Sequence, residues 1–461
     1  MTKVSFNIEA YINREVEFNF RSRSYTFALS QGLFSSAGID GGSRFLLKSF
    51  SSYLDSLIAG QISAGNNETV SNTSCLEETF SVLDAGCGTG VLGICAAGAL
   101  EALGKARGEK TLKVRCQDRD ELARQFTLYN ARKNGIPDET LSTHTEALLS
   151  NCKSKGGGWD LILTNIPAKA GNPVLEDFIQ RSVSLLKKNG RVFMVAVNPK
   201  ADFFRRRLNA CALIHSEEAG KEHTVFVYSR LQESTHGSSI YLDENFPWAY
   251  PFYIREQSEY SMEKISYKLD TVHGAADFDS PGGEVMAAAK LTVKIKLAEK
   301  LFHPVSLLNH DAGQGHFALW LALYLKERIM EKCSWLLSGR NILALTAAKN
   351  NLERCMPIED ARILPAVDLS GISHKEGFNL IAYFPDTVPG TKTEEAAWES
   401  LGRLAAPGCI LIAGMSSFEA ERFDRKKSSL WRRLGDIKRK GFRAMAYQLH
   451  AESQLSAALT P

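Results

Sequence analysis

Long hydrophobic runs and regularly spaced cysteines are missing from this sequence. The longest apolar run, around His316–Leu325, is about half of the roughly 20 residues that span a bilayer, so we expect no membrane partner. The nine cysteines show no CxxC spacing, a pattern typical of reduced thiols in a cytoplasmic protein and not of a zinc site. The histidines are dispersed without ligand spacing, and we therefore expect no metal.

A strong charge of either sign is also missing. The formal net charge is only +3, which permits a nucleic-acid partner without requiring one. The first residues, MTKVSFNIEAYINREVEF, contain acids and no apolar core, so they do not predict a secretory signal. We therefore expect a cytoplasmic protein.

What the sequence does contain is 461 residues, 44% of them hydrophobic, enough for two to four domains. In the first half, strand-like apolar runs alternate with helical patterns. Strands are predicted at 81–84, 112–117, 159–164, 191–197 and 225–228, and helices at 93–103, 121–133 and 175–187. Strands separated by single helices predict an α/β fold with a mostly parallel, doubly wound sheet.

The second half repeats features of the first in the same order. The segment DAGCGTG at 84–90 has a counterpart, NHDAGQG, at 309–315, and Asn130 has a counterpart in Asn351. This order predicts two tandem Rossmann-like domains, and the second is degenerate because its acids are lost. The expected division is a first domain at 1–231, a linker at 232–247 rich in Ser, Gly, Asn and Asp, and a second domain at 248–461.

A glycine-rich loop follows the first predicted strand of the sheet. Gly86, Gly88 and Gly90 allow a tight turn and a close approach to a ligand. Their GxGxG spacing after Asp84 is not the GxGxxG of dinucleotide sites, and no Gly-Lys-Ser/Thr marks a triphosphate loop. Asp118, which ends the next strand, can accept hydrogen bonds from ribose hydroxyls. An adenosine-containing cofactor is indicated; the alternative is that Asp118 only caps a helix.

These residues resemble the first motif, Asp/Glu-x-Gly-x-Gly-x-Gly, of the class I S-adenosylmethionine (SAM) methyltransferases. The resemblance implies SAM as the cofactor, with Asp84 and the three glycines beside its methionine part and Asp118 on its ribose. It also places Glu146, after the third strand, near the adenine. A solvated loop carboxylate is the alternative reading of Glu146.

The segment NIPAKAG at 165–171 resembles the Asn/Asp-Pro-Pro-aromatic motif of methyltransferases that modify planar amide or exocyclic amino nitrogens. The side-chain oxygen of Asn165 and the carbonyl of Ile166 would accept two N–H bonds beside the cofactor and align the nitrogen with the methyl group. Pro167 would keep the backbone stiff. Ile166 replaces the first proline of the motif and Ala168 its aromatic residue. A strand-end turn with a chance Asn-x-Pro is the alternative.

The segments GLFS at 32–35 and GIDGGS at 38–43 resemble the signature of the small-methyltransferase (MTS) family. This family includes ribosomal RNA guanine-N2 methyltransferases built from two tandem domains, one of them degenerate. The resemblance implies ribosomal RNA or a ribosomal subunit as partner, with Phe34, Lys169 and Asn198 as candidate substrate-binding residues. In the well-known members the degenerate domain comes first, whereas here the first domain keeps the motifs.

The sequence has two basic runs, one at 205–207 and one at 422–443. The second run contains ten lysines and arginines. Such runs are usually solvated helix faces, and in an RNA enzyme they become candidates for phosphate contacts. The first hypothesis is a SAM-dependent N-methyltransferase acting on guanine N2 of ribosomal RNA. Two alternatives stand beside it: a protein glutamine N5-methyltransferase, and a catalytically inactive protein that binds SAM or RNA.

Overall fold

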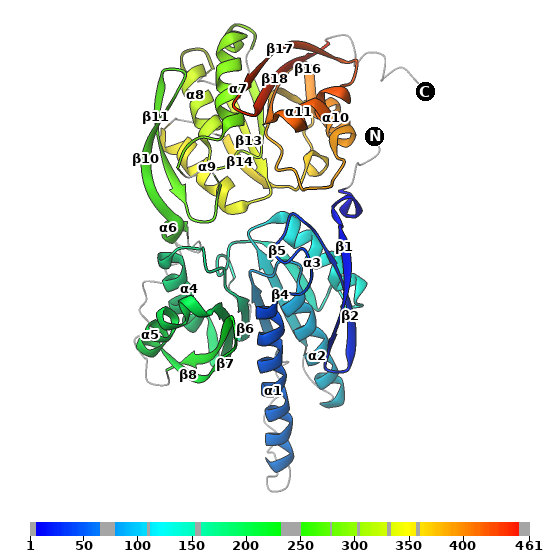
Figure 1. Ribbon diagram of the computed structural model, residues 1–461, viewed down its shortest axis with the longest axis vertical. Helices are drawn as coiled ribbons and strands as arrows, with labels where there is room; N and C mark the ends of the chain where they lie inside the picture. The colour runs from blue at the N-terminus through cyan, green and yellow to red at the C-terminus, as the bar shows by residue number, and fades with distance from the viewer. Residues whose placement is uncertain are drawn as a thin grey trace. The chain divides into compact units, whose positions relative to one another are not determined.

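The computed structural model divides into two compact units (Figure 1). It describes residues 6–64, 79–107, 111–152, 158–231, 250–276, 279–301, 305–329, 333–355 and 360–450. The N-terminal domain is Ile12–Tyr253, and the C-terminal domain combines Ile254–Pro461 with Met1–Tyr11.

The predicted linker at 232–247 lies outside the described residues. Residues 6–11 group with the C-terminal domain and not with the first domain predicted at 1–231. The hydroxyl of Tyr11, which ends the short helix η1 (Ile8–Tyr11), donates a hydrogen bond of 3.0 Å to Asp368 of the C-terminal domain.

The N-terminal domain is a seven-stranded sheet with the order β5-β4-β3-β6-β7-β9-β8, preceded by the hairpin β1-β2. Neighbouring strands are parallel except at β9, which runs antiparallel to both β7 and β8. The strands are β1 (Arg14–Phe20), β2 (Arg23–Leu29), β3 (Phe80–Ala85), β4 (Leu112–Asp118), β5 (Leu141–Thr145), β6 (Trp159–Asn165), β7 (Leu186–Val197), β8 (Ala212–Ala219) and β9 (His223–Arg230). The helices are α1 (Gly41–Ala64), α2 (Val91–Arg107), α3 (Glu121–Lys133), α4 (Asn172–Ser184), η2 (Asn198–Lys200), α5 (Ala201–Cys211) and α6 (Tyr250–Tyr253).

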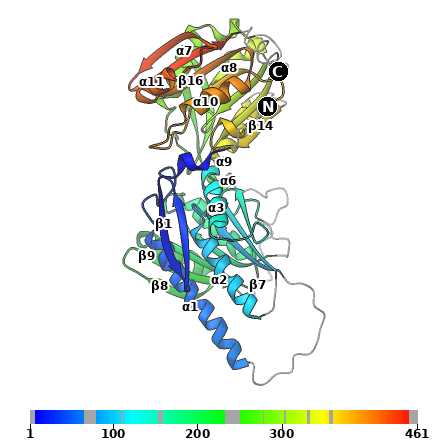
Figure 2. The ribbon, with the colours of Figure 1, turned by 90° about the vertical axis from the view of Figure 1, so that its right-hand side faces the viewer.

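Helices cover both faces of this sheet, and the hairpin lies against α3 (Figure 2). Side chains of α1, α2 and α3 share one hydrophobic core with Val225 and Val227 of β9. The alternate residues of that strand face the other helices: the ring of Phe226 contacts Phe204 of α5, and the hydroxyl of Tyr228 bonds to Ser182 of α4. Because both faces are covered, the central strands read as almost continuous apolar runs.

The C-terminal domain repeats this topology. Its sheet has the order β14-β13-β12-β15-β16-β18-β17 and is preceded by the hairpin β10-β11. The strands are β10 (Ile254–Met262), β11 (Ile265–Val272), β12 (Val305–His310), β13 (Cys333–Gly339), β14 (Asp360–Pro365), β15 (Phe378–Tyr383), β16 (Ala405–Ser416), β17 (Trp431–Arg439) and β18 (Phe442–Leu449). The helices are α7 (Gly283–Lys294), η4 (Leu297–Glu299), α8 (His316–Ile329), α9 (Ile342–Cys355), η5 (Leu369–Gly371), α10 (Glu394–Leu404) and α11 (Ser417–Arg425).

Each domain has a buried asparagine that connects the same three elements: a helix, the second strand of the hairpin and the loop after the first strand of the sheet. Asn130 of α3 exchanges hydrogen bonds with the backbone of Ala28 and donates to the carbonyl of Thr89 in the glycine loop. Asn351 of α9 exchanges hydrogen bonds with the backbone of Asp270 and donates to the carbonyl of Gln314. The shared strand order and this shared brace confirm the predicted fold class, two tandem Rossmann-like domains.

Two sequence expectations concern membranes and metals. Within the described ranges, no helix is long and apolar enough to cross a membrane. Over the same residues, no three His, Cys, Asp or Glu side chains gather closely enough to hold a metal ion.

Candidate active site

The glycine loop joins β3 to α2 at the carboxyl edge of the first sheet. Gly86, Gly88 and Gly90 have φ angles of 81°, 56° and 86°, a region that side chains disfavour. A Cβ on Gly90 would lie 2.8 Å from the Cγ2 atom of Thr127, whereas a Cβ on Gly88 would meet nothing within 4 Å. Gly90 therefore lets the loop pack against α3, and Gly88 borders open space.

Asp84 ends β3 beneath this loop and is completely buried. Its Oδ2 accepts a 2.8 Å hydrogen bond from the N–H of Gly93, while its Oδ1 is buried and accepts none from the residues that the structure describes. Burial raises the pKa of Asp84 to about 7; the Gly93 N–H opposes this shift, and the nearby Asp118 adds to it. A buried carboxylate oxygen without a donor is uncommon in folded proteins, and this one fits a contact with a bound ligand.

Gly93 also belongs to this site, although the GxGxG motif does not include it. A Cβ there would clash with the Sγ atom of Cys116 and would lie 3.0 Å from Oδ2 of Asp84. Only glycine lets the first turn of α2 approach the buried carboxylate this closely. Its place three residues after the GxGxG motif was the available signal.

Replacing Asp84 with asparagine is expected to stabilise the cofactor-free N-terminal domain, more at pH 8 than at pH 5. The folded pKa of about 7 exceeds the reference value of 3.8, so the folded protein holds a proton that the unfolded chain has lost. Wild-type stability therefore falls as the pH rises between these two values, and the variant has no such loss. We expect a gain of at least about 1 kcal/mol at pH 8, or roughly 2–4 °C in Tm. A gain independent of pH in thermal unfolding would contradict the assigned pKa.

Asp118 and Glu146 follow neighbouring strands. The Oδ2 atom of Asp118 accepts a 3.0 Å hydrogen bond from the N–H of Gly88, which joins the acid to the glycine loop. The N–H of Glu146 donates to the carbonyl of Asp118 at 2.8 Å, and its carboxylate accepts from the amide of Asn151 at 3.1 Å. Burial is the main cause that raises the pKa of both acids. The structure thus brings the predicted cofactor acids to one edge of the sheet.

Asn165 ends β6 with its side-chain amide held in one orientation. The Nδ2 atom donates to Oδ1 of Asp40 at 2.8 Å and to Oγ of Ser43 at 3.3 Å. An ionised carboxylate can only accept hydrogen bonds, so the NH₂ group must face Asp40. The carbonyl oxygen of Asn165 is thereby directed away from Asp40 and Ser43.

The residues after Asn165 explain one departure from the family motif. The N–H of Ile166 donates a 3.1 Å hydrogen bond to the carbonyl of Val195 on β7, and its side chain is buried. A proline at this position could not make that bond, so isoleucine extends the strand pairing by one residue. The carbonyl of Pro167 accepts from the N–H of Ala170 at 3.0 Å, which closes a turn. Lys169 lies exposed in this turn.

Asp40 has two roles that sequence patterns show only in part. Its Oδ1 accepts a 2.9 Å hydrogen bond from the N–H of Ser43, as expected for a residue that caps α1. The same oxygen receives the amide of Asn165. A Cβ on Gly42 would lie 3.2 Å from Nδ2 of Asn165, so Gly42 lets the helix begin beside the amide. Asp40 is therefore a positioning residue for Asn165.

The three candidate substrate-binding residues differ in their surroundings. Phe34 lies between β2 and α1 and is 75% exposed, so its ring is available for stacking. Lys169 is exposed in the turn after β6. Asn198, in contrast, donates to the carbonyls of Gly220 and Lys221 at 3.1 and 3.0 Å, so its amide holds the β8–β9 turn.

The C-terminal domain lacks the acids and the asparagine of this site at the equivalent positions. The N–H of Ala366 donates to the carbonyl of Gly339 at 2.9 Å, and this bond corresponds to the one between Glu146 and Asp118. This bond and the strand registers align the two sites. Asn309 stands at the position of Asp84, Gly339 at that of Asp118, Ala366 at that of Glu146 and Phe384 at that of Asn165. A cavity of about 430 Å³ remains at this edge, lined in part by Gly313 and Phe384. Asp311 also lines this cavity, and a Cβ on Gly339 would lie 2.7 Å from its Oδ1, so a carboxylate from the loop after β12 stands beside the position of Asp118.

The chain is similar to known proteins both in sequence and in fold. Residues 68–219 match the family model described as methyltransferase small domain. A curated relative, the uncharacterized protein YbxB of Bacillus subtilis (strain 168), is 28% identical over 178 residues, which cover 39% of this chain and 71% of that protein. The solved structure of the T. thermophilus 16S rRNA N2 G methyltransferase (RsmC), in complex with AdoMet and guanosine, matches with a TM-score of 0.56 and 14% identity. That match covers 96% of this chain and all of the other, and it shows the shared two-domain fold.

S-adenosylmethionine is the cofactor of this family and fold, and the residues present fit it. The open space beside Gly88 would let the cofactor approach the backbone of the glycine loop. The carboxylate of Asp118 would accept hydrogen bonds from the ribose hydroxyls, and the buried Oδ1 of Asp84 still has an acceptor site to offer near the methionine part.

Proposed function

We propose that this chain, whose N-terminal domain belongs to the methyltransferase small domain family, methylates an exocyclic amino nitrogen of an RNA base. Guanine N2 of ribosomal RNA is the proposed target, and the cytoplasm the proposed location. One observation carries the proposal: the hydrogen bond from Asn165 to Asp40 leaves the amide oxygen as an acceptor at the carboxyl edge of the sheet.

The target nitrogen explains why this arrangement suits the reaction. Its lone pair is delocalised into the ring, so it is a weak nucleophile. Two acceptors, the side-chain oxygen of Asn165 and the backbone carbonyl of Ile166, would bind its two N–H groups and present the lone pair to the methyl group. The bound cofactor supplies that methyl group on a positively charged sulfur. Positioning of this kind can account for several kcal/mol of the barrier.

Stacking of the base needs an aromatic ring, and Ala168 does not supply one. The exposed ring of Phe34, on the loop that leads into Asp40, is the proposed substitute. Lys169 would add a positive charge for a phosphate.

The experiment that tests this proposal uses cofactor with a labelled methyl group. Wild-type protein is incubated with ribosomal subunits, stripped ribosomal RNA, transfer RNA and soluble protein from cells lacking it. The proposal predicts label in the ribosomal RNA. Label in the protein fraction would instead favour methylation of a glutamine amide, which presents two similar N–H donors. Intact cofactor binding without label in any fraction would indicate an inactive binding protein.

Replacing Asp40 with alanine is expected to lower kcat by about 10- to 100-fold while the cofactor Kd changes less than threefold. Without its acceptor, the amide of Asn165 can rotate and present its NH₂ group to the substrate, where two donors would face each other. Asp40→Asn is the matched variant, because its side-chain oxygen can accept the same bonds from Asn165 and Ser43. We expect Asp40→Asn to recover most of the lost kcat. Equal losses in both variants would mean that Asp40 acts through its charge.

A further inference from the structure

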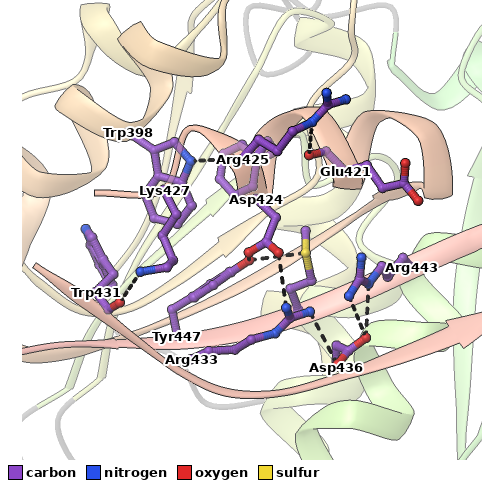
Figure 3. Close-up of polar contacts among 12 residues, drawn as sticks. Trp398, Glu421, Asp424, Arg425, Lys427, Trp431, Arg433, Asp436, Arg443 and Tyr447 are labelled. Carbon is purple, nitrogen blue, oxygen red and sulfur yellow. Dashed lines mark hydrogen bonds and ion pairs between the residues drawn. The ribbon is translucent and has the colours of Figure 1, made fainter. Parts of the chain in front are cut away.

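The basic run at 422–443 belongs to α11, β17 and β18 of the C-terminal domain, and part of it is neutralised within the fold. Arg433 donates to Asp424 at 3.1 Å, and Arg443 donates to Asp436 at 3.0 Å (Figure 3). Asp424 also accepts a 2.6 Å hydrogen bond from the hydroxyl of Tyr447. Arg433 and Tyr447 thus join α11 to the last two strands, and Arg443 joins β18 to β17.

The cations at the tip of the β17–β18 hairpin have no such partners. Lys438, Arg439 and Lys440 make no ion pair with a carboxylate among the residues that the structure describes. Lys438 and Lys440 are exposed, and Arg439 is half-buried. Three consecutive positive charges therefore remain available at one hairpin tip.

The N-terminal domain shows that the fold does not require this charge. By strand register, the equivalent edge strand, β8, carries Ala219 where β17 carries Lys438, and Gly220 stands where Arg439 does. Two of the three arginines in the basic run of the first domain are neutralised: Arg205 pairs with Glu217 at 2.5 Å, and Arg207 pairs with Glu176 at 2.5 Å. The hairpin tip of the C-terminal domain therefore carries Lys438 and Arg439 at positions that are uncharged in the N-terminal domain.

An exposed aromatic ring lies beside the same tip. Phe418, in the first turn of α11, is 69% exposed. The N–H of its neighbour Ser417 donates a 2.8 Å hydrogen bond to the carbonyl of Gly441, directly after Lys440. The guanidinium of Arg422 lies 5.9 Å from the ring centroid. The corresponding position in the N-terminal domain is Pro199, which has no aromatic ring.

We propose that Phe418 and the cations at 438–440 form a docking surface for single-stranded RNA on the C-terminal domain. The cations bind consecutive phosphates, and an unpaired base stacks on the ring of Phe418. Positive charge beside an exposed aromatic ring suits single strands, because every base presents a face for stacking. This inference rests on the proposed function for the identity of the polymer, and it assigns the C-terminal domain a binding role without a cofactor.

The test measures binding of the full-length protein to a short unstructured oligouridine by fluorescence anisotropy over a range of salt concentrations. The triple variant Lys438→Gln, Arg439→Gln, Lys440→Gln should bind more weakly at low salt. The slope of log K against log salt should fall in magnitude by about 2, because each phosphate contact on a single strand contributes about 0.7. An unchanged slope would overturn the assignment of phosphate contacts.

Phe418 is tested with two variants. Phe418→Ala should weaken binding of the single strand about tenfold without changing the salt slope, and Phe418→Trp should restore it. A perfect RNA duplex offers no unpaired base, so its affinity should not respond to either change. Loss of duplex and single-strand binding alike would contradict stacking.

The matched control is Arg205→Gln, Arg207→Gln, which removes cations that are ion-paired on the N-terminal domain. Its affinity for the oligonucleotide should stay within about twofold of wild type. The labelled-methyl assay separates this inference from the proposed function. Label in RNA with unchanged binding by the tip variants would overturn only the docking surface. Label in protein, with RNA binding lost in those variants, would overturn only the proposed substrate.

Discussion

Replacing Asn165 with alanine is expected to lower the rate of methyl transfer by about 10³-fold and to change the cofactor Kd by less than threefold. The carbonyl oxygen of this side chain is the acceptor that aligns the target nitrogen, and its orientation is fixed by the donor contacts to Asp40 and Ser43. Loss of a single preorganised polar group in an active site typically costs about 10²–10³ in kcat.

Single-turnover transfer with saturating cofactor measures this effect directly, and calorimetry measures the cofactor Kd. Asn172→Ala is the matched control, because that amide accepts a 2.9 Å hydrogen bond from the half-buried Lys200 and makes no hydrogen bond to a candidate site residue in the described structure. The control should retain wild-type turnover. If Asn165→Ala turned over at more than about one tenth of the wild-type rate, Asn165 would not be the aligning acceptor.

Replacing Asp118 with alanine is expected to weaken cofactor binding by at least about 100-fold. Hydrogen bonds to a charged group contribute about 1.5–3 kcal/mol each, and a ribose offers two hydroxyls. The carboxylate also accepts from the N–H of Gly88 at 3.0 Å, so its loss loosens the glycine loop. Calorimetric titration of the wild-type chain should give a stoichiometry of one, because Gly339 stands at this position in the C-terminal domain.

Asp120→Asn is the control for this measurement. Asp120 caps α3 by accepting from the N–H of Leu122, and asparagine is an equally good cap. We expect this variant to bind the cofactor within about threefold of wild type, although it removes a charge two residues away. If Asp118→Ala also bound the cofactor within about threefold of wild type, Asp118 would not contact the ribose. A stoichiometry of two would contradict a degenerate second domain.

Features that depend on local sequence were predictable. Helix α3 has the predicted bounds of 121–133, because Asp120 caps its start and the apolar spacing is regular. The glycine loop could be located because its backbone needs positive φ angles at three positions of fixed spacing. The duplication could be recognised because both copies keep the glycine loop and the buried asparagine, which are required by the fold and not only by the site.

Features that depend on distant residues were not predictable. The hydrogen bond between Asp40 and Asn165 joins residues 125 positions apart, and a single sequence holds no record of that contact. For the same reason the attachment of Tyr11 to Asp368, across 357 positions, was missed. The two basic runs look alike in sequence, and only the three-dimensional pairing shows that Arg205 and Arg207 are neutralised whereas the hairpin tip is not.

The measurement that most directly tests the central claim is the identity of the methylated product. Ribosomal RNA from cells lacking the protein is labelled by wild-type enzyme and in parallel by Asn165→Ala, digested to nucleosides and separated by chromatography. The account predicts that the label elutes as N2-methylguanosine with wild-type enzyme and is lost with the variant. Label that eluted as a ring-nitrogen or ribose methylation, or that persisted with Asn165→Ala, would contradict it.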